Sequence, residues 1–80
     1  MSGTATVLYF ASLRDVAGSA SEQVEASGEL GELYEALRAR HGFLLARERL
    51  RVAVDGEFAD WREPVRAGSE IAFIPPVSGG

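Results

Sequence analysis

The sequence contains no cysteine and no lysine among its 80 residues. Without cysteine, the chain cannot form a disulfide, hold a thiolate zinc site or carry sulfur as a side-chain persulfide. Without lysine, it offers no side-chain amine for an isopeptide bond or a Schiff base, because all eight basic residues are arginine. The chain can therefore donate an acyl group to a lysine of another protein but cannot accept one on a lysine of its own.

A basic start, a long apolar run and a positive net charge are also missing. Residues 1–6 have no resemblance to a signal peptide, and no stretch approaches the roughly 20 apolar residues of a membrane helix. The formal net charge of −4 opposes binding to nucleic acid and to anionic membranes, and it favours basic protein surfaces as partners. We therefore expect a cytoplasmic protein that binds neither nucleic acid nor membrane.

Residues that could support chemistry of the chain's own are scarce. His41 is the only histidine, so we predict no metal site. No paired carboxylates and no Ser/His/Asp set indicate independent catalysis, and no bound cofactor is expected. The acidic residues of the central part are predicted to form a solvated face; they are Glu22, Glu25, Glu29, Glu32 and Glu35.

The length and the apolar share of 46% predict one packed domain over residues 1–80, with a C-terminal tail from about residue 75. β-Branched and aromatic residues predict strands at 6–11, 51–54, 57–59 and 70–74, and a weaker strand at 21–26. Residues 12–19 are predicted to form a turn, because they mix Arg14 and Asp15 with Gly18. Residues 43–49 are ambiguous between a loop and a further helical turn.

One helix is predicted from residue 27 onward. Leu30, Leu33, Tyr34 and Leu37 have the spacing that lines one helix face, so all four are assigned to the core. Ser27 is the predicted N-cap, and the helix is expected to end at Gly42.

The order of these elements predicts an α+β fold of the β-grasp type, in which one main helix packs on one face of a mixed sheet of four to five strands. Asp55-Gly56 predicts a type I′ hairpin turn between two of the strands. Residues 7–10 and 71–74 are apolar at odd and at even positions, so apolar side chains point to both faces of the sheet. Only one face of such a sheet is covered by the helix. The second face therefore needs a cover, either a partner protein, which we favour, or the loop at residues 61–65.

The last seven residues, Ile-Pro-Pro-Val-Ser-Gly-Gly, contain two prolines that restrict the backbone and two glycines without side chains. Pro75 and Pro76 favour an extended path, and Gly79 and Gly80 are slim enough to enter a narrow channel in another protein. With Gly80 as the carboxyl terminus, its carboxylate is the natural reactive group. Activation by ATP to an acyl-adenylate, followed by attack of a sulfur nucleophile, would leave a thiocarboxylate on Gly80, and this chemistry suits a chain without cysteine.

Three segments carry a resemblance to a known family: residues 7–15 with Gly18, residues 53–57, and residues 68–80, which end in Pro-Pro-Val-Ser-Gly-Gly. They resemble the small, sulfur-carrier subunits of molybdopterin synthase, within the ubiquitin-like ThiS/MoaD superfamily. The terminal segment is the most specific part of the resemblance.

This resemblance implies that an adenylyltransferase related to ubiquitin-activating enzymes uses ATP to charge Gly80, and that a sulfur donor protein completes the thiocarboxylate. The tail would then enter the large synthase subunit, in a heterotetramer, and supply sulfur to cyclic pyranopterin monophosphate for the molybdenum cofactor. The catalytic pocket is expected on the large subunit.

The resemblance also implies contact residues. Phe10, Phe58 and Ile74 would face the partner, and Arg14 would meet an acidic residue there. The tail residues that would enter the partner are Pro75, Pro76, Val77, Ser78, Gly79 and Gly80. Two other functions stay open, namely a ubiquitin-like protein modifier or a carrier of another pathway such as thiamine thiazole formation, and a third is a plain interaction module with an idle tail.

Overall fold

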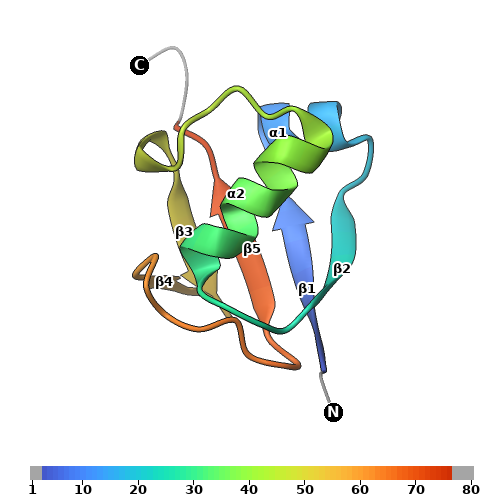
Figure 1. Ribbon diagram of the computed structural model, residues 1–80. Helices are drawn as coiled ribbons and strands as arrows, with labels where there is room; N and C mark the ends of the chain where they lie inside the picture. The colour runs from blue at the N-terminus through green and yellow to red at the C-terminus, as the bar shows by residue number, and fades with distance from the viewer. Residues whose placement is uncertain (1–2, 77–80) are drawn as a thin grey trace.

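Five strands form one mixed sheet in the order β2-β1-β5-β3-β4, and helix α2 lies across one of its faces (Figure 1). The computed structural model describes residues 3–76. Its elements are β1 (Thr4–Tyr9), α1 (Ala11–Ala17), β2 (Ser21–Glu25), α2 (Leu30–His41), a 3₁₀ turn (Arg47–Arg49), β3 (Arg51–Val54), β4 (Glu57–Ala59) and β5 (Glu70–Ile74). The predicted β-grasp fold is thereby confirmed.

The two central strands, β1 and β5, are parallel, whereas the other neighbours are antiparallel. Their register places Leu8 beside Ala72 and Tyr9 beside Phe73. Because parallel strands run in the same direction, the carboxyl ends of β1 and β5 lie at the same end of the sheet. The chain therefore leaves β5 next to the point where it leaves β1 (Figure 1).

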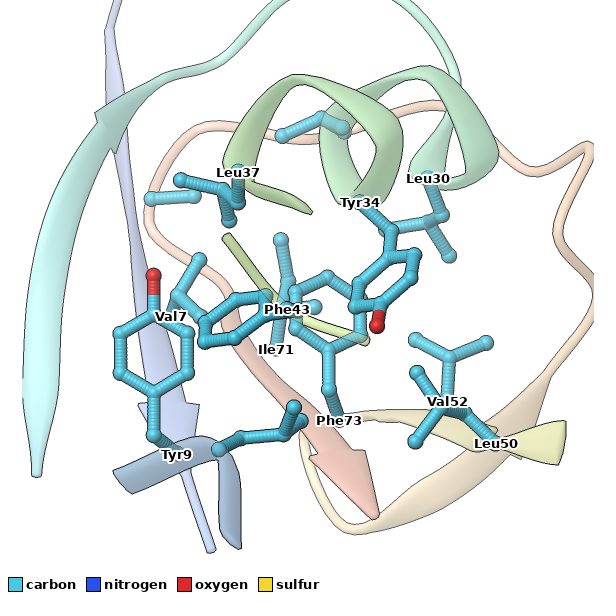
Figure 2. Close-up of a cluster of buried hydrophobic side chains, with 13 residues drawn as sticks. Val7, Tyr9, Leu30, Tyr34, Leu37, Phe43, Leu50, Val52, Ile71 and Phe73 are labelled. Atoms are coloured by element: carbon cyan, nitrogen blue, oxygen red, sulfur yellow. The ribbon is translucent and has the colours of Figure 1, made fainter. Parts of the chain in front are cut away.

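The core lies between α2 and the sheet (Figure 2). Leu30, Tyr34 and Leu37 point from α2 toward the sheet and are buried, as predicted. Leu33, which was also assigned to the core, is only partly buried at its margin. The Tyr34 ring packs against Phe73 at 5.2 Å between centroids, and its hydroxyl donates a hydrogen bond to the Leu45 carbonyl at 2.6 Å.

Helix α2 begins later than predicted, because its N-cap is Glu29 and not Ser27. Gly28 precedes the cap with a positive φ of 71°, which interrupts any helix starting at residue 27. The Glu32 carboxylate then accepts a hydrogen bond from the Glu29 backbone N–H at 2.8 Å, in the manner of a capping box. The predicted end at Gly42 is confirmed, with φ at 80°.

A second helix, α1, occupies the segment predicted to be a turn, so that prediction was wrong. The helix has only seven residues and buries a single side chain, Leu13, before it ends at Gly18. One apolar anchor in two turns gives no repeating pattern, which explains why periodicity did not reveal it. Part of the ambiguous segment 43–49 does form a helical turn, at Arg47–Arg49.

The predicted bounds of β3, β4 and β5 are confirmed, and β1 begins and ends two residues before its predicted bounds. Asp55 and Gly56 both have positive φ, 51° and 86°, as a type I′ turn requires. In the part of the chain that the structure describes, no helix has the length and apolar character needed to cross a bilayer.

Candidate functional site: the uncovered face of the sheet

The face of the sheet opposite α2 carries an apolar hollow of about 710 Å³, here called the open face. Alternation along the strands produces it, because Val7 and Tyr9 point to the core while Leu8 points away, and Ile71 and Phe73 are buried while Ala72 points away. The lining residues are Leu8, Phe10, Ala11, Ala53, Gly56, Phe58, Glu70, Ala72, Ile74, Pro75 and Pro76.

Strand register builds this surface from four strands. Ala53 of β3 lies opposite Ala72 of β5 and opposite Phe58 of β4, while Leu8 of β1 flanks Ala72 on its other side. Small alanines in the middle and larger side chains around them leave a depression. The surface is therefore shaped to receive apolar side chains of another molecule.

Two phenylalanines of the open face remain accessible: Phe58 is 62% exposed and Phe10 is 45% exposed. The Arg51 guanidinium lies over the Phe58 ring, 3.9 Å from its centroid. This cation–π contact holds a positive charge beside apolar surface. Arg51 was missed at the sequence level, although its position two residues before Ala53 on the same strand places both on one face.

The alternative cover of this face, the loop at residues 61–65, lies on the other side of the sheet. The Trp61 ring stacks on Phe73 and packs near Tyr34, both in the core, and Val65 is buried there as well. The Trp61 carbonyl also accepts a hydrogen bond from the Gly31 N–H in the first turn of α2, at 2.8 Å. That alternative was wrong, because aromatic packing draws the loop to the helix side.

The chain leaves β5 at the rim of the open face. Ile74 lies opposite Arg51 in the register, and Pro75 and Pro76 line the hollow itself. The predicted tail residues Val77, Ser78, Gly79 and Gly80 lie outside the described residues. Of the remaining predicted contact residues, Phe10, Phe58 and Ile74 come together on the open face, whereas Arg14 is on α1 and exposed, outside its lining.

A second feature of the sheet, a polar cluster around Glu22, corrects another expectation. Glu22 was predicted to be solvated, but its side chain is only 15% exposed. One carboxylate oxygen accepts hydrogen bonds from the Tyr9 hydroxyl at 2.6 Å and from His41 Nε2 at 2.9 Å, and the other pairs with Arg40 at 2.7 Å. The cluster thus joins β1, β2 and the end of α2.

These contacts shift two ionisations. Burial by itself raises the pKa of Glu22, but the hydrogen bonds from Tyr9 and His41, together with the charge of Arg40, outweigh it, so the pKa is lower than usual. Burial, reinforced by the neighbouring Glu22 carboxylate, raises the pKa of Tyr9 well above its ordinary value. Glu22 is therefore ionised and Tyr9 neutral at physiological pH, as a structural ion cluster requires. Within residues 3–76, no group of three or more potential ligands could hold a metal ion.

Comparison with known proteins identifies the family. The sequence profile of the ThiS family matches residues 7–80. The chain belongs to the ThiS family.

Two relatives of this ThiS-family chain are named for different functions. It is 37% identical to small archaeal modifier protein 1 of Haloferax volcanii, over 89% of this chain and 94% of the relative. It is 34% identical to the human molybdopterin synthase sulfur carrier subunit, over 92% of this chain and 91% of the relative. Family membership therefore covers both sulfur carriers and a protein modifier.

Solved structures agree with this assignment. The crystal structure of the Haloferax volcanii modifier superposes with a TM-score of 0.79, at 34% identity over 98% of this chain and all of that chain. One chain of the BexX/CysO complex from Amycolatopsis orientalis matches with a TM-score of 0.66, at 26% identity over 95% of this chain and 99% of that chain. Proteins similar to this one thus include a member of a complex with another protein.

Proposed function

We propose that this protein is the sulfur-carrier subunit of a molybdopterin synthase and that Gly80, as its terminal residue, bears the sulfur. The observation that carries the proposal is that the chain leaves β5 at the rim of the open face, with Pro75 and Pro76 of the Pro-Pro-Val-Ser-Gly-Gly segment in its lining. The name of the human relative supports the choice of pathway. The protein would act in the cytoplasm, with the large synthase subunit as its main partner in a heterotetramer.

The open face gives the docking step a physical basis. A partner that fills the hollow covers the exposed rings of Phe10 and Phe58 and gains hydrophobic free energy from surface that residues 3–76 leave exposed. Docking there also fixes Pro75 and Pro76 relative to the partner. The residues that follow would then be directed into the active site at little additional entropic cost.

The chemistry takes place on the backbone end. In the adenylyltransferase, the Gly80 carboxylate would attack the α-phosphate of ATP and release pyrophosphate. A hydrosulfide-level nucleophile from the donor protein would then add to the carbonyl carbon and displace AMP, which leaves a thiocarboxylate. In the synthase, this sulfur would bond to an electrophilic carbon of the pyranopterin precursor and displace an oxygen group from that carbon. Water would then cleave the acyl–sulfur bond, which leaves the sulfur on the precursor and regenerates the carboxylate of Gly80.

A second candidate function is conjugation to other proteins, because the relative with 37% identity is named a modifier. It would use the same adenylate, but a lysine amine of the target would displace AMP. The open face would serve the activating enzyme in either case.

Reconstitution separates the two functions. The chain is incubated with its adenylyltransferase, ATP and a sulfur source, and its intact mass is measured. For the carrier we expect a mass gain equal to sulfur minus oxygen, and release of that sulfur when the large synthase subunit and the precursor are added. Adducts to lysines of other proteins, with no such gain, would replace the carrier by the modifier.

An extension tests the terminal position of the reactive group. A variant with one alanine added after Gly80 should fold as the parent does and bind the large subunit, yet gain no sulfur mass. Normal sulfur loading of the untrimmed variant would contradict the proposal.

A further inference from the structure

Strand β2 forms one edge of the sheet, so within residues 3–76 only one of its two sides is paired (Figure 1). Its partner β1 bonds to alternate residues, as an antiparallel ladder does. Bonds from Tyr9 to Ala20 and from Ala26 to Gly3 fix which residues face β1. Because alternate residues of a strand face the same way, the backbone N–H and carbonyl groups of Glu22 and Val24 also face β1.

The backbone groups of the intervening residues therefore point away from the sheet. Those of Ser21 are occupied locally, because the Ser19 hydroxyl donates to the Ser21 carbonyl and accepts from its N–H. The Glu25 carbonyl accepts from the Ser27 N–H at 3.1 Å. Among the described residues, the N–H and carbonyl of Gln23 and the N–H of Glu25 have no backbone partner on the open edge, which is a short template for one more strand.

A groove runs beside this edge, between β2 and α2, with a volume of about 440 Å³. Val24, Leu33 and Ala36 give it an apolar floor, and neither Val24 nor Leu33 is fully buried. Leu33 is therefore only partly buried because it lines a depression, and a further side chain can fill that depression.

The charged residues around the groove indicate which kind of segment can bind there. Glu32 lies along the groove, while Glu25 lies beside it on β2 with its side chain on the opposite face of the strand, and within residues 3–76 neither takes part in an ion pair. The one cation of the lining, Arg40, is already paired with Glu22 at 2.7 Å. A cationic segment is thus favoured over an acidic one.

We propose that the β2 edge and its groove form a second docking site, which takes an extended segment of a partner protein with alternating apolar and basic residues. The segment adds as a sixth strand beside Gln23 and Glu25. Its apolar side chains enter the groove against Val24 and Leu33, and its basic side chains meet Glu25 on the other side of the strand. The groove lies on the α2 side of the sheet, opposite the open face, and β2 contributes no residue to the lining of the open face.

The test uses the full chain and an acetylated, amidated pentapeptide, Val-Arg-Val-Arg-Val. Titration is followed by the ¹H–¹⁵N spectrum of the protein. We expect the largest shifts at the amides of Gln23 and Glu25 and at Leu33, with little change at Phe58. The charge-reversed peptide Val-Glu-Val-Glu-Val should bind at least fivefold more weakly.

N-methylated peptides test for strand addition itself. In an antiparallel addition the arginine N–H groups face β2, and in a parallel addition the valine N–H groups do, because alternate residues face opposite edges. One peptide carries methyl groups on both arginine nitrogens, and the other on those of the second and third valines. We expect one of the two to lose binding at least tenfold and the other to keep it.

Side-chain variants with a matched control complete the experiment. Glu25→Gln should weaken binding of the basic peptide about two- to fivefold, as expected for the loss of one exposed ion pair. Glu57→Gln, on the opposite edge strand β4, should leave it unchanged.

Three results would overturn the proposal: shifts centred on Phe58 and Ile74, equal binding of both methylated peptides, or no binding of the unmethylated peptide at millimolar concentration. Because the test needs neither an adenylyltransferase nor sulfur, its failure is independent of the proposed function.

Discussion

Replacing Phe58 by alanine should weaken docking strongly while leaving the fold intact. A phenylalanine side chain has roughly 200 Å² of surface, and 62% exposure leaves about 120 Å² for a partner to cover. At about 25 cal/mol per Å² this area contributes about 3 kcal/mol, so the dissociation constant should rise about 100-fold. The free chain loses little, mainly the contact of Arg51 with the ring, which contributes about 0.5–1 kcal/mol at an exposed site.

Isothermal titration of the large synthase subunit with the wild-type chain and the variant measures this difference. Thermal unfolding monitored by circular dichroism verifies that the variant is folded. Leu44→Ala is the matched control, because Leu44 is 92% exposed but does not line the open face. If Phe58→Ala bound within threefold of the wild type, the open face would not be the docking surface.

Three further predictions concern the fold. Phe73→Ala, on the core side of the same sheet, should cost about 3–5 kcal/mol and strongly lower the midpoint of a thermal melt, because about 4–12 kcal/mol is typical of the whole stability at this length. Gly56→Ala should cost about 1–2 kcal/mol in urea unfolding, because φ is 86° there. Glu22→Gln should cost about 1–2 kcal/mol at neutral pH. Since the folded state lowers the pKa of Glu22, its contribution is complete above the ordinary glutamate pKa and is lost as the pH falls through the lowered one. Wild type and Glu22→Gln should therefore converge in acid, while Glu25→Gln, an exposed control, should stay within about 0.5 kcal/mol of the wild type at neutral pH.

The sequence predicted those parts of the fold in which a pattern repeats or a turn has a specific chemical signature. The apolar spacing of Leu30, Tyr34 and Leu37 located α2, and Asp55-Gly56 located the hairpin. The apolar character of residues 7–10 and 71–74 at both parities indicated a second surface in need of a cover. These signals lie within short stretches of the sequence, so a single sequence was enough to find them.

What could not be predicted depends on contacts between distant residues. Helix α1 is anchored by Leu13 alone, and Glu22 is drawn from solvent by Tyr9, Arg40 and His41, which come from other elements. Likewise, only the tertiary structure shows that Trp61 packs on Phe73 and that the loop at residues 61–65 does not cover the opposite face. Such arrangements have no periodicity along the chain.

The central position of β5 has a mechanical consequence. This strand is hydrogen-bonded on both sides, to β1 and to β3, and it is the last strand within residues 3–76. A pull on Pro76 along the strand direction would load both ladders together, in shear, so that their bonds share the force instead of opening one after another. Under the proposed function, a partner that holds the end of this chain would pull against both ladders at once.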